Sequence, residues 1–324
     1  MHAAAIDLRG GVSPRGTLLR GQSIIEYILI IAIIGLVIVF AGPGVAGAIR
    51  NQFNLVGNTV NSGATGGVEG GASGGGSTGA DSATVQAAIA KDPKDWTLDE
   101  QKAVAEDIAA KGEASPAYAK AKAAMDAGTE FSMKLTDGKT MTYRIIGINH
   151  DDLADGSGKA GLTFEAANDA LDQQRMNATN ANVGGWEKSE LRDRLNTGDL
   201  WALLPSELQS KVKSVTKMTD NKADGSAGAP SATTDKVFLV SATEVYGNFW
   251  SNGHLQSDGS QYEYYVSKGV ALRNYSGASL NLGYWTRSVH PGGSNYFRYV
   301  NSKGVWDFSF SAFGNHCVQP AWCF

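Results

Sequence analysis

The sequence predicts an α+β protein whose large folded domain is separated from an N-terminal apolar helix by a glycine-rich segment. Three features support this prediction. Residues 27–41 carry no charge, residues 61–81 consist almost entirely of Gly, Ser, Ala and Thr, and near residue 129 a helical pattern gives way to an alternating one. The first two features separate a helix from a domain, and the third indicates that the remainder mixes helices with strands.

Composition excludes two classes of protein. The 324 residues carry a formal net charge of -4 with no basic cluster, so we expect no nucleic-acid partner. Only two cysteines are present, so the chain is not a disulfide-dense secreted scaffold. A hydrophobic core must therefore hold the fold together.

The apolar run at 27–41 is preceded by Ile24 and Ile25 and approaches the roughly 20 residues that a membrane helix needs. Three arginines and one acid come before it: Arg9, Arg15, Arg20 and Asp7. This bias predicts a cytoplasmic N-terminus and an exported remainder. A secretory signal cut within 41–48 is the alternative interpretation.

The residues around this run resemble the type IV pilin superfamily. Gly21 and Gln22 match its processing site, and Glu26 lies four positions after Gln22. The resemblance implies that a prepilin peptidase cuts after Gly21 and that Glu26 meets the N-terminal amine of a neighbouring subunit. A carboxylate in hydrocarbon is costly, which gives such a pairing its physical reason.

The pair Glu26 and Tyr27 resembles the Flp-type pilins of tight-adherence systems, over roughly residues 15–60. Those pilins are short, whereas this chain continues to residue 324. The resemblance therefore implies a minor or tip subunit rather than the main repeating one. Its partners would be the prepilin peptidase, the membrane and other pilin subunits, and its C-terminal domain would lie on the pilus or cell surface.

Between the apolar helix and the large domain we expect a tether and a helical segment. The composition of 57–81 cannot bury enough apolar surface to become ordered. Thr97 and Glu100 then have capping-box spacing, while Gly112 and Gly128 are helix stops. This alanine-rich segment would form a stalk or a lid on the following domain.

The C-terminal domain begins with alternating residues at Phe131, Met133 and Leu135, followed by a turn at Asp137 and Gly138. With the apolar run at 141–148, this pattern predicts a hairpin. We expect further strands at 236–241, 261–266, 284–287, 296–300 and 317–324, and helices at 187–196 and 205–215. The predicted divisions are a leader (1–21), an assembly helix (22–56), a linker (57–81), a stalk (82–128) and an α+β domain (129–324).

Several strings in this domain resemble an uncharacterised domain family common on surface proteins of Gram-positive bacteria. The strings lie at 148–151, 184–192, 203–205, 238–241 and 285–288. That family is itself similar to C-type-lectin-like and sulfatase-modifying-factor folds. The resemblance implies a fold more than an activity. Arg192 and Arg287 would then be structural, stacking on indoles or pairing with a carboxylate such as Glu187 or Glu190.

Three aspartates, Asp151, Asp152 and Asp155, suggest a calcium loop, because hard cations take oxygen ligands. The EF-hand pattern fails, since Leu153 and Leu162 occupy ligand positions. We therefore expect a solvated loop beside a hydrogen-bonded His150, with no metal and no cofactor.

Nine aromatic residues lie within 246–285, and most of them are expected to be core. Trp250 and Tyr275 are flanked by small polar residues, so these two are the candidates for recognition of a surface ligand, a glycan or a protein.

Cys317 and Cys323 could form a disulfide only if the chain turned at Pro320, because a straight strand would hold them about 20 Å apart. A sulfatase-modifying factor would use a C-terminal cysteine pair, but with different spacing. No hydrolase or zinc-protease motif occurs in the sequence.

The sequence therefore predicts a non-enzymatic minor pilin with an extracellular recognition domain. Two alternatives stay open: a membrane-anchored surface protein that never polymerises, and a surface enzyme on a sulfatase-modifying-factor-like fold.

Overall fold

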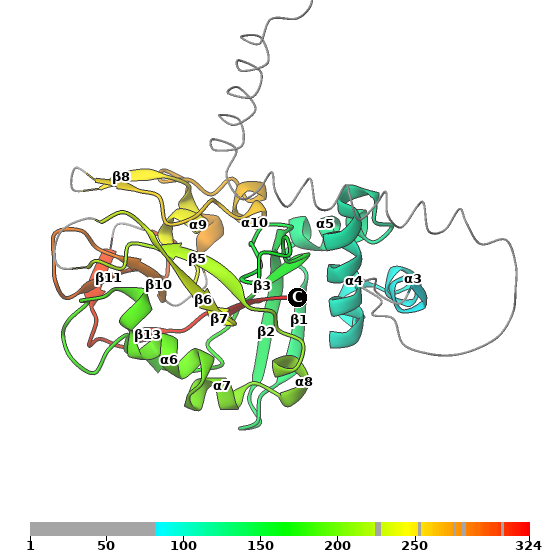
Figure 1. Ribbon diagram of the computed structural model, residues 1–324, viewed down its shortest axis with the longest axis horizontal. Coiled ribbons are helices and arrows are strands. Elements are labelled where there is room, and N and C mark those ends of the chain that lie inside the picture. Colours follow the sequence, from blue (N-terminus) through cyan, green and yellow to red (C-terminus); the bar gives the residue numbers. More distant parts are fainter. Residues whose placement is uncertain (1–81, 224–227, 252–253, 275, 280–282, 306–307) are drawn as a thin grey trace, which may run out of the picture. The chain divides into compact units, whose positions relative to one another are not determined.

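The computed structural model describes residues 82–223, 228–251, 254–274, 276–279, 283–305 and 308–324 (Figure 1). All of them belong to one compact unit, which spans 54–324. The predicted leader (1–21), assembly helix (22–56) and linker (57–81) lie outside the described residues. Within the part of the chain that is described, no helix combines the length and the apolarity needed to cross a membrane.

The described chain begins with helices. They are α3 (Ser82–Ala90), α4 (Leu98–Lys111) and α5 (Tyr118–Ala127), with single 3-10 turns at Pro93–Asp95 and Gly112–Ala114. The capping box is confirmed, because the Glu100 N–H donates to Thr97 Oγ1 and the Thr97 N–H donates to Glu100 Oε2. Gly128 adopts a left-handed conformation, with φ 71°, and ends α5 as predicted.

These helices pack on the following domain. The Gln101 side chain, in α4, donates a hydrogen bond to the hydroxyl of Tyr143 over 3.1 Å. Gly161 lies so close to α4 that an added Cβ would meet the Ala105 carbonyl oxygen at 1.8 Å. Only glycine fits there, so α4 packs directly on the domain. We call the helical segment 82–128 the helical lid.

A five-stranded sheet, here called sheet A, lies beside α4 and α5 (Figure 1). In order across the sheet its strands are β1 (Glu130–Lys134), β2 (Thr140–Ile148), β3 (Leu162–Ala166), β14 (Ala321–Cys323) and β7 (Val237–Phe238). The predicted hairpin is confirmed, since β1 pairs with β2 and the odd-numbered residues of β1 are buried. Neighbouring strands of sheet A run antiparallel to one another.

A second five-stranded sheet, sheet D, contributes the other half of the domain. Its strands in order are β12 (Phe308–Ser311), β11 (Tyr296–Val300), β10 (Tyr284–Val289), β13 (His316–Cys317) and β4 (Gln173–Gln174). Two hairpins are separate, β5 (Val215–Thr219) with β6 (Ser231–Asp235) and β8 (Phe249–Ser251) with β9 (His254–Gln256).

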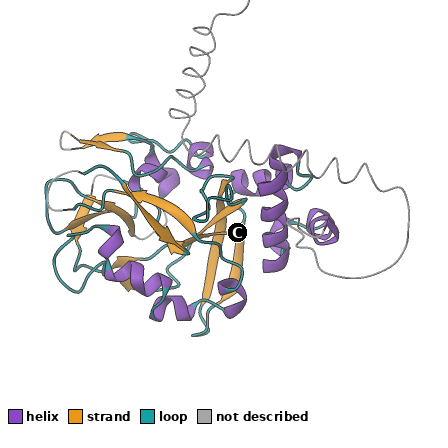
Figure 2. Cartoon of the chain, viewed as in Figure 1, coloured by secondary structure: helices purple, strands orange, loops and turns teal. Residues whose placement is uncertain are grey.

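Short helices connect the strands (Figure 2). They are α6 (Glu190–Asn196), α7 (Asp199–Leu203), α8 (Ser206–Gln209), α9 (Ala242–Tyr246) and α10 (Glu263–Ser267), with 3-10 turns at Trp186–Lys188 and Ser276–Ala278. The described residues therefore form the mixed α+β structure that the sequence predicts.

Three predicted elements differ from the structure. The strand expected at 261–266 is instead the helix α10, in which the adjacent Tyr264 and Tyr265 are both buried while Val266 is 56% exposed, a pattern that the two-residue period of a half-buried strand does not give. The helix expected at 205–215 ends at Gln209, since the Lys213 N–H pairs with Cys323 and Val215 begins a strand. The strand expected at 317–324 is divided between β13 and β14, which belong to different sheets.

Aromatic rings fill the core between sheet A and the helices. Tyr143 lies between Phe131 and Trp322, with ring centroids at 5.4 and 5.0 Å, and Phe164 stacks on Trp322 at 6.0 Å. All four side chains are at most 2% exposed. This packing holds β2, β3 and β14 together, and Asp151 follows the end of β2.

Candidate functional site

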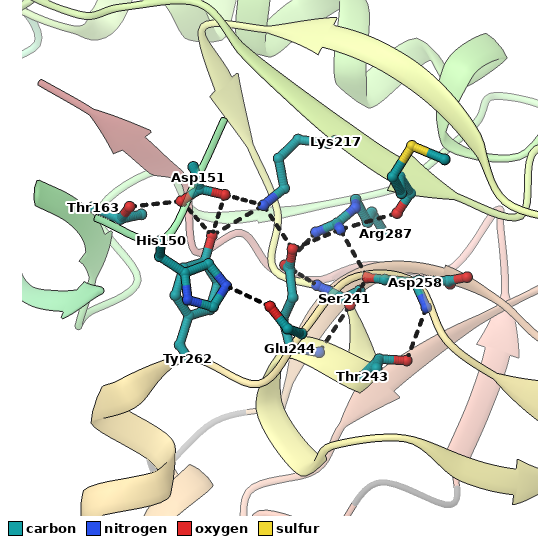
Figure 3. Close-up of polar contacts among 12 residues, drawn as sticks. His150, Asp151, Thr163, Lys217, Ser241, Thr243, Glu244, Asp258, Tyr262 and Arg287 are labelled. Atoms are coloured by element: carbon teal, nitrogen blue, oxygen red, sulfur yellow. Dashed lines mark hydrogen bonds and ion pairs between the residues drawn. The ribbon is translucent and has the colours of Figure 1, made fainter. Parts of the chain in front are cut away.

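Four buried charges form a continuous chain inside the domain (Figure 3). The Lys217 ammonium lies 2.6 Å from Asp151 Oδ1 and 2.6 Å from Glu244 Oε1. Arg287 Nη2 in turn lies 2.8 Å from Glu244 Oε1. None of the four side chains is more than 3% exposed. Burial of an ion is costly unless it is paired, and here the charges alternate in sign. We call these four residues the charge chain.

Each member of the charge chain comes from a different element. Asp151 follows β2, while Lys217 lies on the inward face of β5 with Val215 and Thr219. Glu244 belongs to α9, where its carboxylate also accepts the N–H of Ser241 in a capping box. Arg287 lies in β10, every residue of which is buried. The charge chain therefore links sheet A, a hairpin, a helix and sheet D.

The electrostatics keep all four groups ionised. Burial by itself would lower the pKa of Lys217 and Arg287, but the carboxylates of Asp151 and Glu244 raise the pKa of Lys217 more, and the carboxylate of Glu244 does the same for Arg287. Burial would raise the pKa of Asp151 and Glu244, but the neighbouring cations lower both. The charge chain is thus neutral as a whole and ionised at every member at neutral pH.

The Asp151 end of the charge chain is surrounded by hydroxyl donors. The Tyr262 hydroxyl donates to Asp151 Oδ2 at 2.9 Å, and the Thr163 hydroxyl donates to the same oxygen at 2.6 Å. The Lys217 ammonium also lies 4.3 Å from the centre of the Phe238 ring. Oδ2 therefore faces neutral donors, whereas Oδ1 faces the amine and, at 3.1 Å, the Tyr262 hydroxyl.

The Arg287 end is saturated by carbonyl and hydroxyl acceptors. Its remaining N–H groups donate to Thr219 Oγ1 at 2.8 Å, to the Leu239 carbonyl at 2.8 Å and to the Asp258 carbonyl at 3.0 Å. Such complete pairing fixes the guanidinium and, through it, the position of Glu244.

His150 lies at the edge of the charge chain, with its ring stacked on Tyr262 at 4.0 Å. Its Nδ1 lies 3.1 Å from Glu263 Oε1, and its Nε2 lies 3.3 Å from the Ser260 hydroxyl. Burial lowers the pKa of His150, but the bond to Glu263 and the charge of Asp151 raise it more, so the pKa is above its usual value. The structure thus places His150 in a hydrogen-bonded network, as the sequence predicts.

A pocket of 460 Å³ opens beside Glu263. Met125 and Asp126 of α5 form one side, and Ile148, Gln261 and Val266 form the other. Its walls come from both the helical lid and the domain, so a ligand bound there would contact both.

The three aspartates of the suggested calcium loop do not converge. Asp151 pairs with Lys217 in the interior, while Asp152 is exposed and lies 3.1 Å from the Lys159 ammonium. Asp155 Oδ1 accepts the N–H of Ser157. Nowhere in the described ranges do three His, Cys, Asp or Glu side chains gather as metal ligands would.

Trp250 is the exposed aromatic of its region, with 70% of its surface accessible. It lies on β8 directly opposite Leu255 of β9, which is 49% exposed, and the two share one outward face of the hairpin. Phe249 points the other way and is 2% exposed. Tyr275 lies outside the described residues. The other aromatics that were assigned to the core are buried: Tyr246, Tyr262, Tyr264, Tyr265, Tyr284 and Trp285.

Cys317 and Cys323 are both free and buried, so the structure does not contain the disulfide that the sequence left open. They lie in strands of two different sheets. The Cys323 thiol lies 3.4 Å from Thr163 Oγ1, and burial raises its pKa well above the usual value. Burial and then the charge of Asp169 raise the pKa of Cys317 to about 12. Neither thiol has the low pKa of a nucleophile.

The processing and assembly residues predicted from the sequence are Gly21, Gln22, Glu26 and Tyr27, and all four lie outside the described residues.

The sequence did not reveal the partners of the two arginines. Arg192 pairs with a buried carboxylate, as expected, but this is Asp235 rather than Glu187 or Glu190. Arg287 pairs with Glu244. Ser241 and Glu244 have capping-box spacing, which was the one local signal for α9. Nothing local pointed to Lys217, because Asp151 lies 66 positions before it and Glu244 belongs to a later element, α9.

Comparison with known proteins places part of this structure in a family. No curated protein and no solved structure matches the chain. Residues 158–324 match the family model described as a domain of unknown function, DUF6273. The matched region contains three members of the charge chain, while Asp151 comes before it. Over this larger half of its length, the chain belongs to the DUF6273 family.

Proposed function

We propose that the chain is a minor or tip subunit of a tight-adherence, type IV-like pilus that presents its α+β domain as an extracellular recognition head. The observation that carries this proposal is the sequence Gly21, Gln22, Glu26 and Tyr27 in front of the uncharged run at 27–41. The proposed route is cleavage after Gly21 by a prepilin peptidase at the cytoplasmic side of the membrane. Assembly with other pilin subunits then follows through Glu26.

The character of the head supports a binding role. The ion pairs of the charge chain connect elements in its interior, while the side chains of Trp250 and Leu255 are exposed to solvent on a hairpin. An exposed indole offers an apolar face and a polar edge, which suits a glycan or a protein surface. A relation of the head to C-type-lectin-like folds is part of the same proposal. The proposed role is binding rather than catalysis.

Glu26→Ala tests the assembly step. We expect the variant to be cleaved after Gly21 but to be lost from sheared filaments, because no carboxylate remains to pair with the neighbouring amine. Immunoblots of filament and membrane fractions, with N-terminal sequencing of the retained protein, measure both steps. Glu69→Ala makes the same change in the glycine-rich segment and should assemble normally.

Two other results would decide against assembly. Filaments that contain the Glu26→Ala variant at wild-type levels would contradict it. A native chain that begins at Met1, or beyond residue 41, would favour a membrane-anchored or secreted surface protein that never polymerises.

Trp250→Ala tests recognition by the head. Cells that display the variant are expected to attach at least about tenfold less to immobilised glycans or matrix proteins that hold wild-type cells, since a central aromatic contact is typically worth about 2 kcal/mol or more. Phe313→Ala removes another exposed aromatic, which is 56% accessible, and serves as the control. Equal attachment of wild-type and Trp250→Ala cells would remove Trp250 from the recognition surface.

A further inference from the structure

The charge chain holds an amine between two carboxylates, away from water (Figure 3). The amine is that of Lys217, and the carboxylates are those of Asp151 and Glu244. The amine lies 2.6 Å from an oxygen of each carboxylate. From this geometry we propose that Lys217 and Asp151 condense to an intramolecular amide bond, with Glu244 as the group that moves the protons. This crosslink goes beyond the proposed pilus function and does not depend on it.

The surroundings favour condensation. In water an ammonium and a carboxylate are strongly hydrated, and that hydration opposes amide formation. Here the Lys217 side chain is 3% exposed and lies against the Phe238 ring, so neither partner keeps a hydration shell. The ammonium and the carboxylate have thus lost the hydration that stabilises them in water. The neutral amide depends much less on hydration, so burial favours the product.

The reaction begins with a proton transfer within the ion pair. The raised pKa of Lys217 and the lowered pKa of Asp151 make the ion pair the resting state. The ammonium gives one proton to Asp151 Oδ1, the oxygen it faces, which leaves a neutral amine and a carboxylic acid. This transfer is uphill, so the bond is expected to form slowly after the domain has folded.

The amine nitrogen then attacks Asp151 Cγ. A C–N bond forms, and the electron pair of the C=O bond moves onto Oδ2. The hydroxyls of Tyr262 and Thr163 already donate to Oδ2, at 2.9 and 2.6 Å, and would stabilise the charge there.

Glu244 completes the exchange. Its carboxylate, kept ionised by Arg287, accepts a proton from the attacking nitrogen and returns it to Oδ1. The C–O bond breaks, and Oδ1 leaves as water. One ammonium and one carboxylate thus become one amide and one water, with no oxidant, reductant or other reagent.

The mass of the protein tests this proposal directly. Full-length protein is folded, incubated for several days, denatured and measured by intact mass spectrometry. We expect the mass to be lower than that of the processed sequence by one water molecule. Fragmentation of a protease digest should give a branched peptide that joins Asp151 to Lys217.

Variants separate the roles of the three residues. Lys217→Arg keeps the charge but removes the nucleophile, and Glu244→Gln keeps a polar side chain but removes the proton carrier; both should retain the full mass. Lys139→Arg is the control, because Lys139 and Asp172 form an exposed Lys–Asp pair. It should lose one water as the wild type does. Near-UV circular dichroism reports whether each variant is folded.

The wild-type protein alone can overturn the proposal, whatever the variants do. A folded wild-type chain that keeps its full mass after incubation excludes the crosslink. A loss of one water located at an Asp–Gly step, such as Asp155–Gly156, or a branch between other residues, excludes it equally.

Discussion

Replacing Arg287 with alanine is expected to lower the free energy of unfolding by about 3 to 5 kcal/mol, because it leaves the buried charge chain with one uncompensated negative charge. Glu244, whose side chain is 2% exposed, loses its guanidinium partner, and the single Lys217 ammonium then faces two carboxylates. The Thr219 hydroxyl and the carbonyls of Met218, Leu239 and Asp258 would lose hydrogen bonds at the same time. Urea unfolding followed by circular dichroism measures the change.

The matched control for this prediction is Arg194→Ala. Arg194 also pairs with a carboxylate, that of Asp199 at 2.8 Å, but the Asp199 side chain is 64% exposed. Solvent already screens this pair, so its loss should cost at most about 1 kcal/mol. If the two variants lose similar stability, burial is not what makes the charge chain important.

Trp322→Ala is expected to cost about 3 to 5 kcal/mol, the usual loss when a fully buried large aromatic is truncated. Trp322 is 0% exposed and contacts Tyr143 and Phe164 in the core of sheet A. Because β14 has strands on both sides, the backbone around Trp322 cannot easily shift to fill the cavity that the truncation leaves. Thermal and urea unfolding give the magnitude.

Trp250→Ala is the same chemical change at a site that is 70% exposed. It should alter stability by no more than about 0.5 kcal/mol. A large loss there would mean that the hairpin face is packed against another part of the protein, which would also contradict its proposed recognition role.

Local signals predicted the local structure well. The spacing of Thr97 and Glu100 located the start of α4, and the alternation from Phe131 onward located the first hairpin of sheet A. In both cases the residues that decide the structure are within a few positions of one another. Burial in strands follows the same short period, which the sequence displays directly.

The errors arose where tertiary contacts prevail over local preference. Tyr262, Tyr264 and Tyr265 favour a strand by propensity, yet the segment is a helix in which the adjacent Tyr264 and Tyr265 both pack into the core. The residues 317–324 form two strands because their partners belong to two sheets. Pairings of this kind depend on distant residues, and no short pattern encodes them.

The charge chain illustrates the same limit at the candidate site. The aspartate-rich stretch with glycines around Asp151 predicts a solvated loop, whereas the Asp151 side chain is buried against Lys217. Its partner Lys217 is 66 positions away, and Arg287 is 43 positions from Glu244. Only the fold brings these charges together.

The position of β14 has a consequence for how the molecule is made. This strand lies between β3 and β7 in sheet A. Cys323 of β14 is paired with Thr163 of β3, and the two residues are 160 positions apart in the chain. Contacts between such distant segments form slowly, because a long loop must close first. During synthesis from the N-terminus, β3 and β7 lack the strand that pairs with both of them until residues 321–323 have left the ribosome. A nascent chain is therefore expected to remain open to chaperones and to protease until translation has passed this strand.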